Sequence, residues 1–338
     1  MLNRYSTFII SIFTSTLLTF SNVNAEVKVV ASIKPIHSLV SYVMDGVGKP
    51  SIIVDGSNSP HNFNLKPSNA KAIENADIIF WVGEDIESFL EKPLKSISKK
   101  AKVIEMMDIK GIKKLKFRER NIFEEHEGHD DHGHEKKDKH DDHGHGKKEK
   151  HDDHGHGKKE KHDDHAHGHG HGEYDPHIWL DPHNAEVMVE EIAKQLAAID
   201  PQNAATYKKN SNNAIEDIEK LIKDTKKEMK KGISYIVFHD AYQYFEKEFN
   251  VSALGALTLN TDVAPGAKQI SEIREIIEHD NVKCLFSEPQ FNPDIIKSIA
   301  KGTNVKIGVL DPLGANLNNG KELYFKLIKD ISSSLKKC

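Results

Sequence analysis

Hydrophobic residues in the first half of the chain form short runs that alternate with longer amphipathic stretches. The runs are rich in Val and Ile and cover residues 27–32, 51–54, 78–82 and 102–104. The stretches with helical spacing cover residues 35–47, 68–75 and 85–100. Runs that are apolar on both faces predict buried parallel strands, and the stretches between them predict helices that cover the sheet.

The second half of the chain repeats this pattern. Its strand-like runs cover residues 234–238, 251–257, 282–286 and 305–310. Its helix-like stretches cover residues 241–249, 266–279, 293–301 and 321–337. The fold class predicted from both halves is therefore α/β, with two mostly parallel-sheet lobes.

A long uninterrupted segment connects the two halves. Asp181-Pro182 predicts the start of a helix that ends at Ile199, because a capping carboxylate precedes a proline at the first helical position. Asp200-Pro201 repeats this signal, and neither proline nor glycine follows before Gly232. We expect a stiff linking helix over 201–231, about 45 Å long. It would join an N-terminal lobe, 26–200, to a C-terminal lobe, 232–338.

The amino terminus has the pattern of a secretory signal peptide. Arg4 precedes a short apolar run, 8–20, and the small residues around Ala25 suit cleavage. The run is too short to span a bilayer comfortably, and the alternative is a buried apolar helix. We predict a signal peptide at residues 1–25, with no cysteine positioned for lipid attachment, and hence a periplasmic or secreted mature protein.

Residues 126–172 interrupt the first half with a histidine-rich repeat. Its unit, HDDHGHGKKEK, occurs twice in succession at 140–161, and looser copies flank it. Fifteen of the 21 histidines in the chain lie between His126 and His171. The tract has almost no aliphatic residues, so it cannot bury enough apolar surface to order itself, and we expect disorder without metal.

Charge and cysteine content narrow the possible partners. The formal net charge is −5, and no basic stripe is interleaved with aromatic residues, so a nucleic-acid partner is not expected. The 2 cysteines are Cys284 and Cys338. In an oxidising compartment they are natural disulfide partners, and the alternative is two free thiols. We also expect the protein to be a monomer.

Candidate metal ligands lie outside the tract, where strand-like runs end. His61 follows a strand and a proline, His177 lies in DPHIWLDP just beyond the tract, and His239 ends the run SYIVFH. Asp311 ends the last strand in the same way. Ligands of open α/β sheets collect at the carboxyl ends of strands, and three imidazoles with one carboxylate suit Zn²⁺. Spacing alone does not show that the four residues converge, and each histidine could instead be structural.

Together the motifs SPHNFNLKPS, DPHIWLDP, FHDAYQYFE, SEPQF and LDPLG resemble the periplasmic zinc-binding proteins of bacterial ABC importers, the metal-binding solute-binding proteins with a rigid linking helix. The resemblance covers essentially all of 26–338. It implies one tight metal site in the cleft between lobes, formed by His61, His177 and His239, with Asp311 at or beside the fourth position. Because manganese-type relatives place a carboxylate where this chain has His239, the resemblance implies zinc.

The resemblance also implies an ABC permease at the inner membrane as partner and no enzymatic role. A secreted zinc hydrolase and a metal buffer centred on the tract remain alternatives. The tract would act as a low-affinity antenna or store for further Zn²⁺ ions, because ordering a flexible chain weakens each binding event. Its candidate ligands are His129, His132, His134, His140, His143, His145, His151, His154, His156, His162, His165, His167, His169 and His171. Binding should weaken as imidazoles protonate below about pH 6.5.

Overall fold

The computed structural model describes residues 26–123, 172–259, 261 and 265–338 of the 338-residue chain. The predicted signal peptide, 1–25, and the predicted low-affinity histidines of the tract lie outside these residues. Within them, no helix is long and apolar enough to cross a membrane.

The first four-stranded sheet has the parallel order β2-β1-β3-β4. Its strands are β1 (Val29–Ile33), β2 (Ser51–Val54), β3 (Ile78–Trp81) and β4 (Lys102–Glu105). The connecting helices are α1 (Lys34–Val43), α2 (Pro67–Asn75) and α3 (Glu84–Ser96), and η1 (Met106–Asp108) follows the last strand. The inner strands β1 and β3 are buried along their whole length, as expected for a parallel sheet covered by helices.

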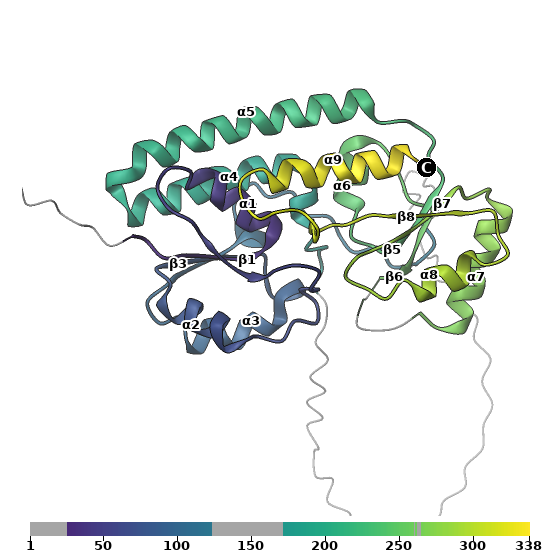
Figure 1. Ribbon diagram of the computed structural model, residues 1–338, viewed down its shortest axis with the longest axis horizontal. Helices are drawn as coiled ribbons and strands as arrows, with labels where there is room; N and C mark the ends of the chain where they lie inside the picture. Colours follow the sequence, from purple (N-terminus) through teal and green to yellow (C-terminus); the bar gives the residue numbers. More distant parts are fainter. Residues whose placement is uncertain (1–25, 124–171, 260, 262–264) are drawn as a thin grey trace, which may run out of the picture.

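The second sheet repeats this topology with the order β6-β5-β7-β8, again all parallel. Its strands are β5 (Tyr235–His239), β6 (Gly255–Thr258), β7 (Cys284–Ser287) and β8 (Lys306–Val309). Its helices are α6 (Gln243–Phe249), α7 (Ala267–His279) and α8 (Asp294–Ala300). The two sheets lie side by side beneath the long helices (Figure 1). The predicted α/β fold with two parallel sheets is confirmed.

The linking segment is slightly shorter than the sequence predicts. Helix α4 (Pro182–Ile199) has the predicted bounds, and the Asp181 side chain caps it by accepting from the backbone N–H of His183. A short 3₁₀ turn, η3 (Pro201–Asn203), then precedes helix α5 (Ala204–Glu228). The 25 residues of α5 make a rod of about 37 Å. It packs along α4 and reaches from the first sheet toward the second (Figure 1).

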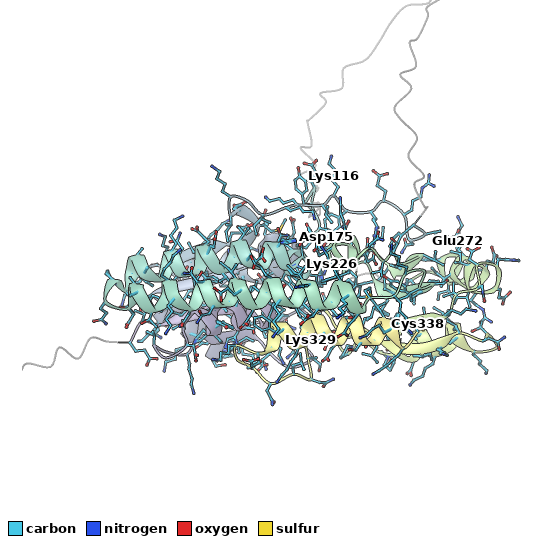
Figure 2. The ribbon with its side chains drawn as sticks, turned by 90° about the horizontal axis from the view of Figure 1, so that it is seen from above. Lys116, Asp175, Lys226, Glu272, Lys329 and Cys338 are labelled. Carbon is cyan, nitrogen blue, oxygen red and sulfur yellow. A yellow bond between two sulfur atoms is a disulfide. The ribbon has the colours of Figure 1, made fainter. Side chains whose placement is uncertain are left out.

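The chain crosses from β8 to the first sheet, and the carboxyl-terminal helix α9 (Leu323–Lys336) then runs back toward the second sheet, packing on α1 and α5 (Figure 1). Figure 2 shows its course between the labelled residues Lys329 and Cys338. The Tyr324 hydroxyl donates to the carbonyl of Trp179 at 2.9 Å, and one hydrophobic core runs without a break through α4, α5 and α9. Cys284 of β7 and Cys338 form the predicted disulfide, with their Cα atoms 5.7 Å apart.

Residues 113–123 and 172–177 flank the histidine-rich tract, and together we call them the stem. Both segments cross between the two sheets. Lys116 and Tyr174 form an antiparallel bridge within the stem. The sequence places the insertion within the first lobe, but the segment before the tract reaches the second sheet. There, Phe123 N–H donates to the Leu254 carbonyl at 2.9 Å. Strand β6 is a sheet edge with unpaired backbone groups, which explains this attachment.

Candidate metal site

Three predicted ligands converge between the two sheets. His61 lies in the loop after β2, His177 immediately precedes the 3₁₀ turn η2 (Ile178–Leu180), and His239 is the last residue of β5. One imidazole nitrogen from each lies within 4.8 Å of the other two. His177 and His239 are buried, whereas His61 is partly exposed and lies on the accessible side of the site.

The geometry of the three rings suits a tetrahedral metal ion. Their centroids form a near-equilateral triangle, with sides of 5.6, 5.7 and 5.2 Å. The Nε2 atoms of His177 and His239 lie 3.3 Å apart. Zn–N bonds of about 2.0–2.1 Å place two nitrogens of a tetrahedral site about 3.3 Å apart. The two buried histidines therefore already have the spacing of adjacent zinc ligands.

In each buried histidine Nε2 faces the site, and the opposite ring nitrogen, Nδ1, pairs with a buried carboxylate. The Nδ1 atom of His177 lies 2.6 Å from Asp175 Oδ1, and that of His239 lies 2.7 Å from Glu288 Oε1. A carboxylate accepts hydrogen bonds, so in the neutral rings the proton lies on Nδ1 and Nε2 carries a lone pair. Two lone pairs that face each other at 3.3 Å would repel, and either a proton or a metal cation between them removes this repulsion. Carboxylate–histidine–metal chains use this arrangement.

The pKa directions of the two rings differ. Burial, with a smaller contribution from the charge of His239, lowers the pKa of His177 well below its ordinary value. Burial also acts to lower the pKa of His239, but the charge and hydrogen bond of Glu288, with Asp240 and Asp175, raise it above its ordinary value. A divalent cation bound here would meet a neutral His177 and would compete with a proton for His239, so its binding would be coupled to proton release.

Two carboxylates beside the ligands can balance the charge of a divalent cation. Burial raises the pKa of Asp175 to about 7, while hydrogen bonds from His177 and Gln243 oppose this change. A cation bound by neutral imidazoles would favour the ionised form of Asp175. The positive charge of the ion would then lie within reach of two negative charges in a buried site.

The structure does not bring Asp311 into the histidine group. Its Oδ1 accepts from the backbone N–H groups of Leu313 and Gly314, both at 3.0 Å, and its Oδ2 accepts from that of Ala315 at 2.6 Å. Oδ1 also accepts from Gln290 Nε2 at 2.9 Å. The carboxylate at this strand end is thus held by its own loop and is not part of the group whose donor atoms lie within 4.8 Å of one another.

His37 and His183 have structural partners outside the site. His37 is buried, and its Nε2 lies 3.1 Å from the Pro50 carbonyl. His183 is paired with Glu186 at 3.0 Å in the first turn of α4. The contacts of both residues therefore indicate structural roles.

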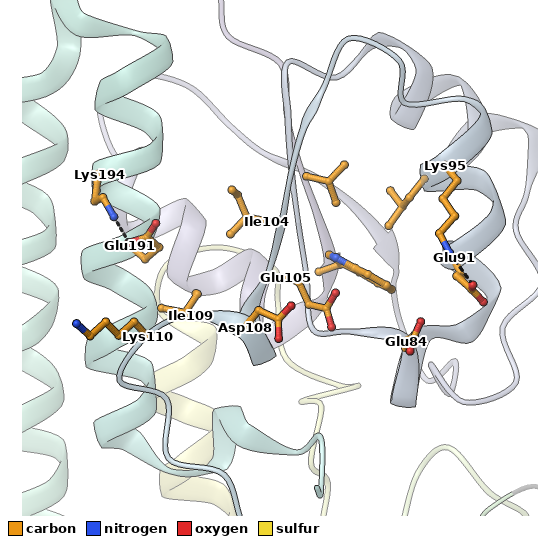
Figure 3. A pocket seen from close by; sticks show the side chains of 13 residues that line it. Glu84, Glu91, Lys95, Ile104, Glu105, Asp108, Ile109, Lys110, Glu191 and Lys194 are labelled. Carbon is orange, nitrogen blue, oxygen red and sulfur yellow. Dashed lines mark hydrogen bonds and ion pairs between the residues drawn. The ribbon is translucent and has the colours of Figure 1, made fainter. Parts of the chain in front are cut away.

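A larger hollow of about 680 Å³ lies at the outer edge of the first sheet (Figure 3). Its wall carries the carboxylates of Glu84, Glu105 and Asp108, and the ion pairs Glu91–Lys95 and Glu191–Lys194. Burial, together with Asp108 and Glu84, raises the pKa of Glu105 to about 7. None of its lining residues lines the histidine cavity. The larger of the two cavities is therefore not the candidate metal site.

Sequence reasoning missed Asp175 and left Glu288 without a role. Asp175 lies two residues before His177, where its Oδ1 also accepts from the His177 backbone N–H at 2.9 Å. A local signal therefore existed, because an Asp two residues before a ligand histidine can reach both its backbone and its ring. Glu288 is 49 positions from His239, and only the pairing of β5 with β7 brings the two together.

Comparisons with known proteins agree with this architecture. The profile of the ZnuA family, described as "Zinc-uptake complex component A periplasmic", matches residues 29–338. The chain is 48% identical over 340 residues to the "High-affinity zinc uptake system protein ZnuA" of Brucella abortus, covering 100% of this chain and 99% of that protein.

Solved structures show the same fold. The "Crystal structure of ZnuA" has a TM-score of 0.68 at 20% identity and covers 92% of this chain and 100% of that one. The laminin-binding adhesin Lmb from Streptococcus agalactiae has a TM-score of 0.67 at 22% identity and covers 91% and 99%. From the profile match and the full-length similarity, the chain belongs to the ZnuA family of periplasmic zinc-uptake components.

Proposed function

We propose that this protein captures Zn²⁺ with His61, His177 and His239 and delivers it to an ABC-type permease for zinc uptake. The proposal rests on the buried Nε2 atoms of His177 and His239, which lie 3.3 Å apart. In each ring the opposite nitrogen, Nδ1, is hydrogen-bonded to a carboxylate. The relatives named as high-affinity zinc uptake proteins support it.

Ligand chemistry supports zinc as the cargo. Three imidazoles form a site of intermediate softness that suits Zn²⁺, whereas Mn²⁺ and Mg²⁺ prefer sets dominated by oxygen. In this chain the two carboxylates bind the imidazoles and leave nitrogen atoms facing the site. The negative charges thus balance the ion without presenting a mainly oxygen ligand set.

A carrier fits the site better than the zinc hydrolase that the sequence leaves open. The cavity bounded by the three histidines, Trp179 and Phe291 has a volume of about 10 Å³. That volume holds about one water-sized sphere. A hydrolytic zinc needs an open position for water beside an organic substrate, and a cavity of this size favours an ion alone.

We place the mature protein in the periplasm as a monomer, after cleavage of the signal peptide at residues 1–25. The periplasmic description of its family supports this location. We propose the lobe boundaries 26–200 with the insertion 126–172, the linking segment 201–231, and 232–338, and the presence of two separate sheets supports this division.

We assign the histidine-rich tract the role of a low-affinity antenna or store. The stem ends beside the site, because Gly172 N–H donates to Asp85 at 2.8 Å and His177 follows five residues later. Ions held by the tract would therefore be released close to the tight site. If zinc loading at limiting metal is as fast without residues 126–171 as with them, the antenna role is wrong.

Zinc titration against a competing chelator tests the main proposal. A chain that lacks residues 126–171 should retain one tight zinc site. His61→Ala and His239→Ala in that chain should abolish tight binding, while His183→Ala should not. Loss of all tight binding on tract removal would instead make the tract the principal site and favour the metal buffer.

A further inference from the structure

The histidine cavity contains a side chain that the three ligands do not explain. Gln290 lines the cavity together with His61, His177 and His239. Its amide oxygen, Oε1, is buried and has no hydrogen-bond partner within the described part of the chain. Leaving a buried acceptor without a partner destabilises the folded chain. An acceptor kept in this state beside a metal site suggests that the bound ion satisfies it.

Asp311 determines which end of the Gln290 amide faces the cavity. Gln290 Nε2 donates to Asp311 Oδ1 at 2.9 Å. A carboxylate accepts and does not donate, so a reversed amide would place two oxygens against each other. Asp311 cannot turn away easily, because both of its oxygens already accept backbone N–H groups of residues 313–315. The Gln290 oxygen is therefore the atom left for a ligand.

The size of the cavity limits what else can occupy the fourth coordination position. Its volume of about 10 Å³ corresponds to a single water-sized sphere. An ion that fills this volume leaves little enclosed space for a bound water. A tetrahedral zinc ion with three imidazole ligands would then need its fourth donor from the protein.

On the basis of the zinc-carrier function proposed above, we propose that the amide oxygen of Gln290 is the fourth ligand of the bound ion and that Asp311 positions it. The site would contain three imidazole nitrogens and one neutral oxygen. The charge would be balanced by Asp175 and Glu288, which contact the ligands and not the ion.

Glu288 is the competing candidate, because its Oε2 is also buried without a partner. Its other oxygen is bonded to Nδ1 of His239, on the opposite side of the ring from Nε2. Among the described residues, the carboxylate is not part of the group whose donor atoms lie within 4.8 Å of one another. This position suits a residue that orients His239 and does not suit a ligand.

Gln290→Leu in the full mature chain tests the assignment with one molar equivalent of Zn²⁺ or Co²⁺, which fills the tight site before the tract. We expect zinc affinity to fall at least about tenfold, and the visible absorption of the Co²⁺ form to change because one donor is lost. Gln195→Leu removes the same amide from the outer helix α4, where it pairs with Glu191, and should alter neither measurement. Circular dichroism shows whether each variant is folded.

Gln290→Glu is the second variant, and it decides the question if the Leu variant fails to fold. A carboxylate at the fourth position should keep zinc binding and shift the Co²⁺ spectrum. It should also give a larger rise in melting temperature on zinc addition, because the positive charge of the ion offsets the repulsion between the new carboxylate and that of Asp311. Unchanged zinc affinity and Co²⁺ spectra in the Leu variant, or an unchanged Co²⁺ spectrum in the Glu variant, would overturn the assignment. A parent chain that binds no ion tightly would instead refute the zinc function.

Discussion

Two buried acid–imidazole pairs decide which nitrogen of each ring can bind metal. Asp175 is completely buried, and three donors hold it: the backbone N–H and Nδ1 of His177, and Nε2 of Gln243 at 2.6 Å. Glu288 performs the equivalent task for His239 from a neighbouring strand. The tautomers of both rings are thus fixed before an ion arrives, and little reorganisation is needed on binding.

Asp175→Asn should weaken zinc binding by about 10- to 100-fold while the chain remains folded. Asn keeps the shape of the side chain but removes the charge that balances the ion. A chelator competition measures the affinity. Asp45→Asn is the matched control, because Asp45 is half exposed and pairs with Lys321 at the surface. Equal zinc affinity in Asp175→Asn and the parent chain would show that Asp175 is only a structural residue.

Glu87 should make the stability of the metal-free protein depend on pH. Burial raises its pKa to about 7, although Oε2 accepts from the backbone of Val82 at 2.7 Å. The folded chain therefore binds this proton more tightly than the unfolded chain. Its contribution to stability is present at acidic pH and is lost as the pH rises from about 4.5 through 7.

Glu87→Gln should accordingly raise the melting temperature at pH 8 and have little effect at pH 5. The gain in unfolding free energy at pH 8 should be about 1–3 kcal/mol, because each pKa unit corresponds to about 1.4 kcal/mol. Glu91→Gln, on the exposed part of the same helix, controls for charge alone. A gain of the same size at both pH values would contradict a buried titrating carboxyl group.

The sequence predicted which histidines converge better than it predicted the orientation of a side chain. His61, His177 and His239 were predicted because all three follow or end apolar runs, and the parallel sheets place these ends together. Asp311 satisfies the same rule, yet its carboxylate accepts the N–H groups of its own loop. The spacing of residues along the chain does not show which way a side chain points.

The stem is the element that connects the tract to both sheets. Arg118 lies within it and donates to Asp240 at 2.6 Å and to Glu246 at 2.5 Å. Tyr244 of α6 holds the other side of the stem, accepting from Leu115 N–H and donating to the Asp175 carbonyl. Figure 2 shows Lys116 and Asp175 in this crossing region, which is therefore part of the fold that supports the site.

Arg118→Met should lower the free energy of unfolding by about 3 kcal/mol, because it leaves two buried carboxylates without their cation. Urea denaturation of the metal-free protein measures this loss. The loss should be smaller at pH 5 than at pH 8, since burial already raises the pKa of Asp240 to about 6 and its protonated form tolerates burial. Lys95→Met, which breaks an exposed pair with Glu91, should cost at most about 0.5 kcal/mol.

The sequence predicted most elements because buried parallel strands and amphipathic helices have strong periodic patterns. Strand β2 and helix α4 have the predicted bounds. The linking helix begins later than predicted, because the 3₁₀ turn η3 forms after Asp200. It also ends earlier than predicted, at Glu228. The attachment of residues 121–123 to β6 was not predicted, since an isolated edge bridge leaves no periodic signal.

At the scale of the whole molecule, the linking helix is not the only connection between the two sheets, because helix α9 and a continuous hydrophobic core also join them. Helix α9 begins after the second sheet, packs on α1 and α5, and is tied back to β7 by the disulfide. The hydrophobic core continues from β1 and β3 through α4 and α9 to β5 and β7. Hinge motion would expose part of this core, so the molecule should respond to zinc by ordering the loop that carries His61 rather than by closing its lobes.

Small-angle X-ray scattering of a chain without residues 126–171, with and without one equivalent of Zn²⁺, tests this rigidity. We expect the same radius of gyration in both states, because His177 and His239 already have the spacing of zinc ligands and no lobe needs to move. Hydrogen exchange should slow around His61, the partly exposed member of the site, and remain unchanged in α5 and α9. Clear compaction on zinc addition would show that the lobes close around the ion. The continuous core would then have to separate in the metal-free state.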